Sequence, residues 1–238
     1  MSKLILPKVY ENEGNKYPQH KGKYKLSYSQ YSSWIDPEYR NDYIVQYFLG
    51  IRLPDGIWAK YGGEVGTYIE CKANKTEFPV FEMLSEEDKG FLDSLDYPPN
   101  CLYEDEICVD MESFVTQGFT DRTELLAPQS LGIKDYKTGN LDKKASYYAD
   151  EAYGQTTLYA YQKQQEGFEI TYSRVCLLGR KGNNMTIKGV YYPIKLSGEY
   201  KIIDTPYSEE RAQAVLDKMR IAAEEISDLY KVYLKFFT

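Results

Sequence analysis

Apolar and aromatic residues recur along the chain at helical spacing in several stretches, and these stretches predict the helices. One helical pattern begins at Ser27 or Ser29, either of which suits an N-cap, and continues to Phe48. A shorter helix is predicted over 85–95, where Ser85 begins a capping pattern. The remaining helices are predicted over residues 57–73, 145–165 and 208–236.

Alternation of apolar and polar residues predicts the strands. Segments 103–111, 114–121 and 132–137 are expected to form an antiparallel meander. The intervening "RTELLAPQSL" contains a proline and is predicted to be a loop. Strands are also predicted over 170–178 and 185–194, on either side of the glycine-containing turn "GRKGNN". This order predicts an α/β fold, with one mixed sheet that carries helices on both faces.

The chain of 238 residues suits one large domain, because it is long enough to bury a substantial core. We divide it into a polar arm (1–25), a core (26–178) and C-terminal additions (179–238). The last predicted helix has an apolar side, which we expect to cover the chain's own core rather than a partner. That side consists of Val215, Met219, Ala222, Ile226 and Tyr230.

Composition narrows the possible chemistry. The chain has 36 acidic and 29 basic residues, so indiscriminate adhesion to polyanions is not expected, although a local basic groove remains compatible with this average. The four cysteines form no C-x-x-C pair and are interpreted as reduced thiols. His20 is the single histidine, which argues against histidine-based zinc or triad chemistry. No apolar run approaches the roughly 18 residues needed to span a bilayer, so we expect a cytoplasmic protein.

The stretch "IKDYKTGN" contains the strongest candidate chemistry. Asp135 and Lys137 are two residues apart on a predicted strand, so both side chains face the same way, about 7 Å apart at Cα, while Tyr136 faces the opposite side. Asp121 lies near the end of the preceding predicted strand, and a hairpin would bring both carboxylates to one end of the sheet. Two carboxylates so close favour a cation between them, and Mg²⁺ prefers such oxygen ligands.

A lysine beside a metal site suits hydrolysis of a phosphodiester, because an ammonium can orient a metal-bound water or stabilise charge on a phosphate. The motif D-x-K-T-G alone also occurs by chance. Gly118, three residues before Asp121, strengthens the signal. Gln155 and Tyr159 strengthen it further, since residues four apart share one face of a helix. Alternatively, Gln155 is a solvated helix residue and Tyr159 a core aromatic.

Together, Gly118-x-x-Asp121, Asp135-Tyr136-Lys137-Thr138-Gly139 and Gln155-x-x-x-Tyr159 resemble the RecB-like branch of the PD-(D/E)xK nuclease superfamily. This branch includes the nuclease domains of bacterial RecB and AddB, RecB-like CRISPR-associated exonucleases and many phage nucleases. The resemblance extends from "LSYSQYSSW" to about Tyr161, over half of the chain. It implies a restriction-endonuclease-like core, with a mixed central sheet flanked by helices on both faces.

The resemblance also implies roles for individual residues. Asp121 and Asp135 would bind Mg²⁺ or Mn²⁺, and we place Tyr136 in the same metal-binding set. Lys137 would assist hydrolysis. Gln155 and Tyr159 would line the path of the DNA and complete the catalytic set. The opening of the family's first helix is matched by a segment containing Ser27 and Ser29, which become candidate DNA-binding residues.

This sequence departs from the family pattern in two places. Gly66 occupies the position where the family often has a histidine, and Glu70, one turn later, is our candidate for the metal side. The alternative is that Glu70 is an ordinary solvated acid. Family members with an iron–sulfur cluster have a tight cysteine group after the core, but Cys176 stands alone there. No iron–sulfur cluster is therefore expected.

Basic residues and exposed rings supply further candidates for DNA contacts. Bases near the motifs are Lys143, Lys144, Arg180 and Lys181, and Tyr147 and Tyr148 are possible stacking surfaces. Each of them is equally compatible with an ordinary surface residue.

The sequence therefore predicts a Mg²⁺-dependent deoxyribonuclease, and more narrowly an exonuclease of recombination, repair or phage DNA processing. Its expected partners are DNA and a helicase or a single-strand annealing or recombination protein, with no membrane. It would act in the cytoplasm, or in the host cytoplasm if phage-encoded. One alternative is a catalytically inactive subunit that keeps the nuclease fold for DNA binding or assembly. Another is a carboxylate–metal enzyme that acts on a different phosphate compound.

Overall fold

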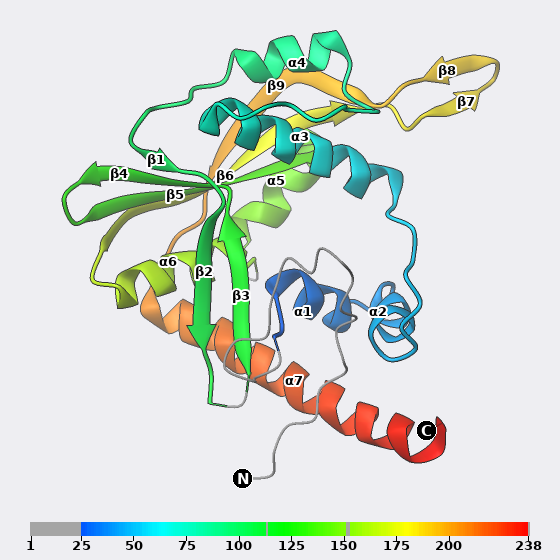
Figure 1. The fold of residues 1–238 in the computed structure, drawn as a ribbon, viewed down its shortest axis with the longest axis vertical. Helices are drawn as coiled ribbons and strands as arrows, with labels where there is room; N and C mark the ends of the chain where they lie inside the picture. The colour runs from blue at the N-terminus through cyan, green and yellow to red at the C-terminus, as the bar shows by residue number, and fades with distance from the viewer. Residues whose placement is uncertain (1–24, 113, 151–152, 238) are drawn as a thin grey trace. The chain divides into compact units, whose positions relative to one another are not determined.

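The computed structural model describes residues 25–112, 114–150 and 153–237 (Figure 1). Apart from residue 25, the predicted polar arm lies outside the described residues. The chain forms two compact units. Among the described residues, unit 1 comprises those within 25–54, 106–118 and 209–237, and unit 2 comprises those within 55–105 and 119–208.

Unit 2 is built on a five-stranded sheet with the strand order β1-β4-β5-β6-β9. The two central strands, β5 and β6, run parallel, whereas the other neighbours are antiparallel. The sheet is therefore mixed, which confirms the predicted α/β class. The strands are β1 (Cys101–Leu102), β4 (Arg122–Ala127), β5 (Ser130–Gly139), β6 (Glu169–Lys181) and β9 (Lys195–Asp204).

Helices cover both faces of this sheet, as predicted. Tyr136 and its neighbours Cys176 and Leu178 face the layer that contains α3 (Ile57–Asn74) and α4 (Glu86–Asp93). Residues of the opposite parity face the other layer, where α5 (Leu141–Ala149) and α6 (Gln155–Gln165) pack on β5, β6 and β9. The sequence predicted α3 to within one residue. It also predicted the Ser85 cap of α4, in which the Ser85 hydroxyl accepts the N–H of Asp88.

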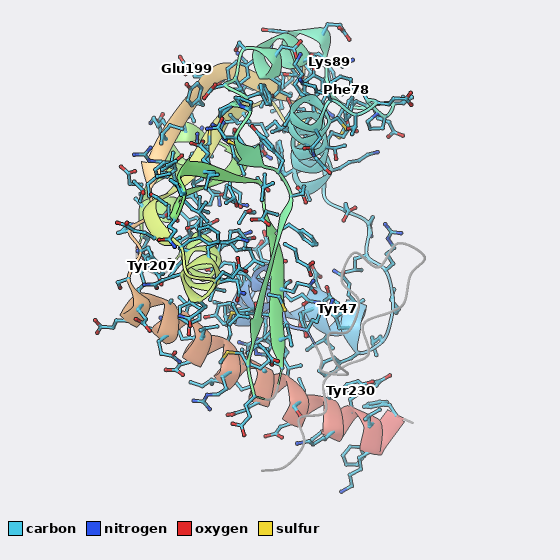
Figure 2. All side chains as sticks on the ribbon, turned by 60° about the vertical axis from the view of Figure 1, so that its left-hand side comes forward. Tyr47, Phe78, Lys89, Glu199, Tyr207 and Tyr230 are labelled. Atoms are coloured by element: carbon cyan, nitrogen blue, oxygen red, sulfur yellow. The ribbon has the colours of Figure 1, made fainter. Side chains whose placement is uncertain are left out.

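Unit 1 contains α1 (Tyr28–Ile35), α2 (Arg40–Tyr47) and α7 (Glu209–Phe237). The five apolar residues predicted to line one side of α7 are all buried, which confirms that this side covers a core. Phe48 packs edge-on against the ring of Tyr230, with centroids 5.0 Å apart. Figure 2 labels Tyr230 on α7 and Tyr47 on α2. The strands β2 (Asp105–Asp110) and β3 (Val115–Thr120) pair in a separate two-stranded sheet.

The helix predicted from Ser27 or Ser29 to Phe48 is wrong in one respect, because the structure divides it into α1 and α2. The break follows Asp36, which has extended φ and ψ angles of −82° and 117°. Pro37 explains this break, since proline disfavours the helical conformation of the residue before it.

The single helix predicted over 145–165 is also two helices, α5 and α6. The first begins earlier than predicted, because the Asn140 side chain accepts the N–H groups of Asp142 and Lys143 and so caps α5. It ends at Ala149, and the next residue, Asp150, is extended. Gly154 then precedes α6, so Gln155 is the first residue of a new helix.

The predicted antiparallel meander is wrong as well. Segment 114–121 contains β3, which pairs with β2 and is not a strand of the central sheet. The neighbour of β5 is instead β4, which lies in the segment predicted to be a loop. Pro128 occupies only the turn between β4 and β5, so it does not prevent pairing of the residues before it.

The predicted strand over 185–194 is a hairpin of β7 (Met185–Ile187) and β8 (Val190–Tyr192). The reversal occurs at Lys188 and Gly189, whose φ angles are 50° and 78°. A two-residue turn with both φ angles positive matches the right-handed twist of a hairpin. The edge strand β9 was not predicted, and β6 continues through Arg180 and Lys181, which were predicted to lie in a turn.

None of the helices within the described part of the chain combines the length and the apolar character needed to cross a membrane.

Candidate active site

Strand β5 positions Asp135 and Lys137 on the face of the sheet that is covered by α5 and α6. Asp135 is completely buried, and the Lys137 ammonium lies 2.5 Å from its Oδ2 atom. Their spacing of two residues puts both side chains on one face of an extended strand, as the sequence predicts. An ion pair this close holds the lysine beside the carboxylate.

Asp121 reaches the same place from the bend between β3 and β4. Its Oδ2 atom accepts the backbone N–H of Tyr136, which is the residue between Asp135 and Lys137. The β4–β5 hairpin makes this possible, because Arg122, the next residue, pairs across the ladder with Lys134. The structure thus brings Asp121, Asp135 and Lys137 together.

Burial and the neighbouring charge of Asp135 raise the pKa of Asp121 to about 7. Burial would lower the pKa of Lys137, but the carboxylates of Asp135 and Asp121 outweigh it and raise that pKa above its usual value. At neutral pH Lys137 therefore stays an ammonium, while Asp121 lies near the midpoint of its titration. Strongly perturbed pKa values of this kind are typical of functional sites.

The Oδ1 atom of Asp135 is buried and accepts no hydrogen bond from any described residue. A buried acceptor without a partner is unfavourable, so its presence calls for an explanation. A hard divalent cation supplies one, because Mg²⁺ binds one or two carboxylates and keeps several of its waters. The donor set of Asp121 and Asp135 fits such an ion.

A chain of hydrogen bonds connects Asp135 to α6. The Tyr153 hydroxyl lies 3.4 Å from Oδ2 of Asp135 and 3.1 Å from Oε1 of Gln155. The Gln155 amide donates to the Tyr159 hydroxyl over 2.6 Å. Burial and the charge of Asp135 raise the pKa of Tyr159, which keeps its hydroxyl protonated. Gln155 and Tyr159 thus belong to the same cluster as the carboxylates.

Tyr153 is the residue of this cluster that the sequence analysis missed. It lies within the stretch predicted as one continuous helix, and no motif spacing singles it out. The available signal was Gly154, whose position favours a break in the helix. A break there frees the preceding aromatic residue to turn toward the sheet.

The Tyr136 side chain does not join the site. Its hydroxyl lies on the opposite face of the sheet, where it accepts a hydrogen bond of 3.2 Å from Arg122. Only the backbone of Tyr136 lies beside the carboxylates, through the N–H that binds Asp121. Side-chain coordination of a metal by Tyr136 is therefore excluded, because residues adjacent in a strand point to opposite faces.

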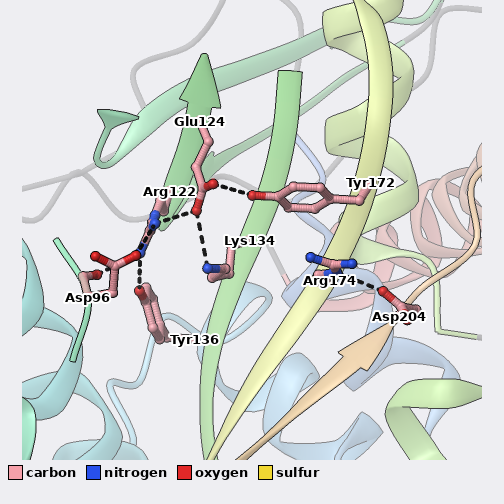
Figure 3. Close-up of polar contacts among 8 residues, drawn as sticks. All are labelled: Asp96, Arg122, Glu124, Lys134, Tyr136, Tyr172, Arg174 and Asp204. Carbon is pink, nitrogen blue, oxygen red and sulfur yellow. Dashed lines mark hydrogen bonds and ion pairs between the residues drawn. The ribbon is translucent and has the colours of Figure 1, made fainter. Parts of the chain in front are cut away.

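A charge cluster around the buried Arg122 of β4 lies on the face of the sheet opposite to the site, and Figure 3 shows its side chains. Arg122, which is 2% exposed, forms ion pairs with Glu124 and Asp96. Glu124 also pairs with Lys134 at 3.1 Å and accepts the hydroxyl of Tyr172. Because Arg122 directly follows Asp121, this cluster fixes the start of β4, next to the bend that carries one of the two carboxylates.

The structure does not bring Glu70 into the site. Glu70 lies on α3, which packs on the opposite face of the sheet from Asp135. Across the described ranges, no three histidine, cysteine, aspartate or glutamate side chains converge closely enough to hold a metal ion. Glu64, on the same helix, accepts the backbone N–H groups of residues 82, 83 and 84 and holds that loop.

The basic candidates lie in two places. Lys143 and Lys144 are exposed in α5, and the Lys144 ammonium lies 5.2 Å from the ring centroid of Tyr147. Arg180 stacks over the ring of Trp58 at 4.2 Å, and Lys181 is exposed at the end of β6. These positions are accessible to a ligand, but they do not by themselves identify one.

Ser27 and Ser29 belong to unit 1, where they form the beginning of α1. The Ser27 hydroxyl accepts the N–H of Gln30, and the Gln30 side chain accepts the N–H of Ser27. The Ser29 hydroxyl lies 3.0 Å from that of Ser27. This reciprocal arrangement is a capping box, so Ser27 has a structural role in the helix.

No protein-family model matches the chain, and neither does any curated protein sequence. Among solved structures, the chain is similar to a protein from Eubacterium rectale described as a "putative exonuclease". The TM-score is 0.52 at 12% identity, over 93% of this chain and 87% of that chain. The structure of SSO0001 matches 51% of each chain at 13% identity, but its TM-score of 0.28 supports no conclusion. The first similarity shows a shared mixed α/β fold.

Proposed function

We propose that the protein is a metal-dependent DNA nuclease of the RecB-like branch of the PD-(D/E)xK superfamily, and that it degrades DNA as an exonuclease. The observation that carries this proposal is the convergence of Asp121 and Asp135 beside Lys137. The fold shared with the Eubacterium rectale protein supports it. The motif resemblance adds the RecB-like assignment.

Asp121 and Asp135 are the residues that would hold Mg²⁺ or Mn²⁺. The ion would supply a Lewis acid for the phosphate and a bound water of lowered pKa. Oδ1 of Asp135, which lacks a partner among the described residues, is the atom best placed as a ligand. Asp121 must lose its proton to become a ligand, so its pKa of about 7 makes metal binding dependent on pH.

Lys137 would act through its charge. Because the neighbouring carboxylates raise its pKa, its Nζ atom keeps its protons at neutral pH and does not serve as a general base. A fixed ammonium stabilises the charge that develops on a phosphate and orients a water molecule by donating to it. Its ion pair with Asp135 holds it in place for this role.

Tyr153, Gln155 and Tyr159 would hold the carboxylate and border the path of the substrate. Gln155 is half-buried at the first turn of α6, where backbone N–H groups have no partner within the helix. Such groups can donate to a phosphate. The hydrogen bonds that link the three side chains keep the Gln155 amide oriented.

The direct test is degradation of end-labelled linear DNA and of circular DNA with Mg²⁺ or EDTA. Asp135→Asn should abolish degradation, because it removes a carboxylate charge from the site. Asp142→Asn is the matched control, since its side chain is 93% exposed and pairs with Lys201 on the surface. Degradation of linear DNA only would support an exonuclease, and cleavage of circular DNA would replace that assignment with an endonuclease.

Measurements of DNA binding, of RNA degradation and of the hydrolysis of a simple phosphodiester separate the alternatives. Binding of DNA without degradation of any DNA or RNA would favour the inactive subunit. Metal-dependent hydrolysis of a simple phosphodiester, with no action on nucleic acids, would favour a different phosphate substrate. If the nuclease proposal holds, we place the protein in recombination, repair or phage DNA processing in the cytoplasm, together with a helicase or annealing protein.

A further inference from the structure

The hairpin of β7 and β8 projects from unit 2 (Figure 1). From here on, the arm means residues 185–192 and not the polar N-terminal segment 1–25. Every residue of the arm is exposed. An isolated two-stranded hairpin is only marginally stable in water. A hairpin without a covering layer therefore needs its own source of rigidity, and its exposed side chains need a reason to be apolar.

Local geometry gives the arm its shape. Lys188 and Gly189 form a two-residue turn in which both φ angles are positive, and Met185 pairs directly with Tyr192. At the base, Oδ1 of Asn184 accepts the N–H of Ile194, which is buried, over 2.7 Å. These contacts hold the arm to the body of unit 2.

The side chains of the arm are unusual for a free surface. Alternation along paired strands puts four apolar residues on one face, namely Met185, Ile187, Val190 and Tyr192, which are 45–58% exposed. Tyr191 on the other face is 57% exposed. Contiguous exposed apolar side chains of this kind mark an interaction surface.

Charge indicates what the surface binds. The segment 179–198 contains four basic residues and no acid, in a chain whose net charge is −7. Lys195 is neutralised by Glu87 at 2.9 Å. Lys188, at the turn, forms no ion pair with a described residue. Lys181 is exposed at the end of β6, where its charge also helps to lower the pKa of Glu87. A positive segment on an acidic protein favours a polyanion over a protein partner.

Strand β6 connects the candidate active site to the arm. Lys137 pairs with Leu177 and Gly139 pairs with Gly179, after which β6 continues to Lys181. The arm therefore begins beyond the end of the sheet toward which β5 runs from Asp135. Met185 lies eight residues after Leu177, which corresponds to at most about 26 Å of extended chain.

We propose that the arm binds single-stranded nucleic acid. Unpaired bases stack on Tyr192 on one face of the arm and on Tyr191 on the other, and the phosphates contact Lys181 before the arm and Lys188 at its turn. Stacking on exposed rings beside cations is the usual mode of sequence-independent single-strand binding. The inference that the bound strand is the substrate rests on the proposed nuclease function, whereas the binding itself does not.

Fluorescence anisotropy with a labelled single-stranded oligonucleotide in EDTA tests the proposal without cleavage. The double variant Tyr191→Ser, Tyr192→Ser should bind at least about fivefold more weakly, because each lost stack weakens binding. Lys188→Glu is a second, independent variant and should also weaken binding. Tyr200→Ser and Lys218→Glu are matched controls, since both residues are exposed outside the arm, and they should bind like the wild type.

Hydrolysis of bis-p-nitrophenyl phosphate with Mn²⁺ separates this proposal from the nuclease proposal, because a small ester has no unpaired bases to stack on the arm. DNA binding that depends on the arm, without hydrolysis of any substrate, would support the proposal that the arm binds nucleic acid and would contradict the nuclease proposal. Arm variants that bind DNA like the wild type would contradict the proposal that the arm binds nucleic acid, whether or not hydrolysis persists. If the arm variants lose a self-association that the wild type shows in sedimentation, and still bind DNA like the wild type, the proposal would also be contradicted. The arm would then be a contact between copies of the chain.

Discussion

At the scale of single residues, the most informative feature is that three ionisable side chains lie together but differ in protonation and in hydrogen-bond partners. Asp121 has a raised pKa, Lys137 keeps its proton, and Asp135 is fully buried with one unpartnered oxygen. The period of two along a strand was enough to predict that Asp135 and Lys137 share a face. The role of Tyr153 could not be predicted, because it depends on where α6 begins.

The raised pKa of Asp121 predicts how the stability of the metal-free protein depends on pH. The folded state binds this proton more tightly than the unfolded chain, so its contribution to the free energy of unfolding is complete below about pH 4. It is lost as pH rises through the folded pKa of about 7. The melting temperature in EDTA should therefore fall from pH 5 to pH 8, and Asp121→Asn should make that fall smaller.

Added Mg²⁺ extends this prediction, since the ion competes with the proton on Asp121. Mg²⁺ should raise the melting temperature more at pH 8 than at pH 5 in the wild-type protein. An Asp121→Asn variant with the same pH dependence as the wild type would show that Asp121 is not the titrating group.

Lys137 offers a separate test of electrostatic catalysis. Lys137→Met should lower kcat for DNA hydrolysis by roughly 100-fold or more, because it removes a fixed charge beside the reacting phosphate. Lys137→Arg should restore part of this loss, since the charge returns with a different shape. Single-turnover kinetics at saturating Mg²⁺ would measure both, and wild-type kcat in Lys137→Met would remove the lysine from the reaction.

At the scale of elements, strand β4 decides whether the site forms. The sequence analysis missed this strand because Pro128 and the length of the segment between the predicted strands favoured a loop. Its pairing depends on contacts distant in sequence, above all the buried cluster of Arg122 with Glu124 and Lys134. Two predicted helices are each divided in the structure, for local reasons at Pro37 and near Gly154. The bounds of the long α3 and α7 were predicted closely.

The cluster predicts a large difference between two arginines drawn in Figure 3. Arg122→Met should lower the free energy of unfolding by about 3 kcal/mol or more, because it removes a buried partner from the Glu124 carboxylate, which is 14% exposed. Arg174→Met should change it by only about 0.5 kcal/mol, since Arg174 pairs with the exposed Asp204 at the surface. Urea unfolding measures both, and equal effects would contradict the role assigned to the cluster.

At the scale of the whole molecule, an acidic protein is proposed to bind a polyanion through a few local charges. The sequence predicted the α/β class and helices on both faces, because the order of periodic segments constrains the layers. It did not predict the arm or β9, since the pair Lys188-Gly189 inside an apolar run gave too weak a turn signal. The single-domain organisation stays a prediction beside the two compact units.

Salt dependence should reveal how many charges the arm contributes. For single strands, each phosphate contact adds about 0.7 to the slope of log K against log salt. The double variant Lys181→Gln, Lys188→Gln should therefore reduce the magnitude of this slope by about 1.4, and Lys218→Gln should leave it unchanged. Titrations in EDTA at several salt concentrations provide the slope. An unaltered slope in the double variant would place the phosphate contacts elsewhere.

The central claim is that Asp121 and Asp135 converge on one divalent cation, and calorimetric titration with Mn²⁺ at pH 8 tests it most directly. The account predicts one Mn²⁺ ion per chain for the wild type and for Asp142→Asn, and loss of that site in both Asp121→Asn and Asp135→Asn. Binding of Mn²⁺ with wild-type affinity by either of these two variants would contradict it.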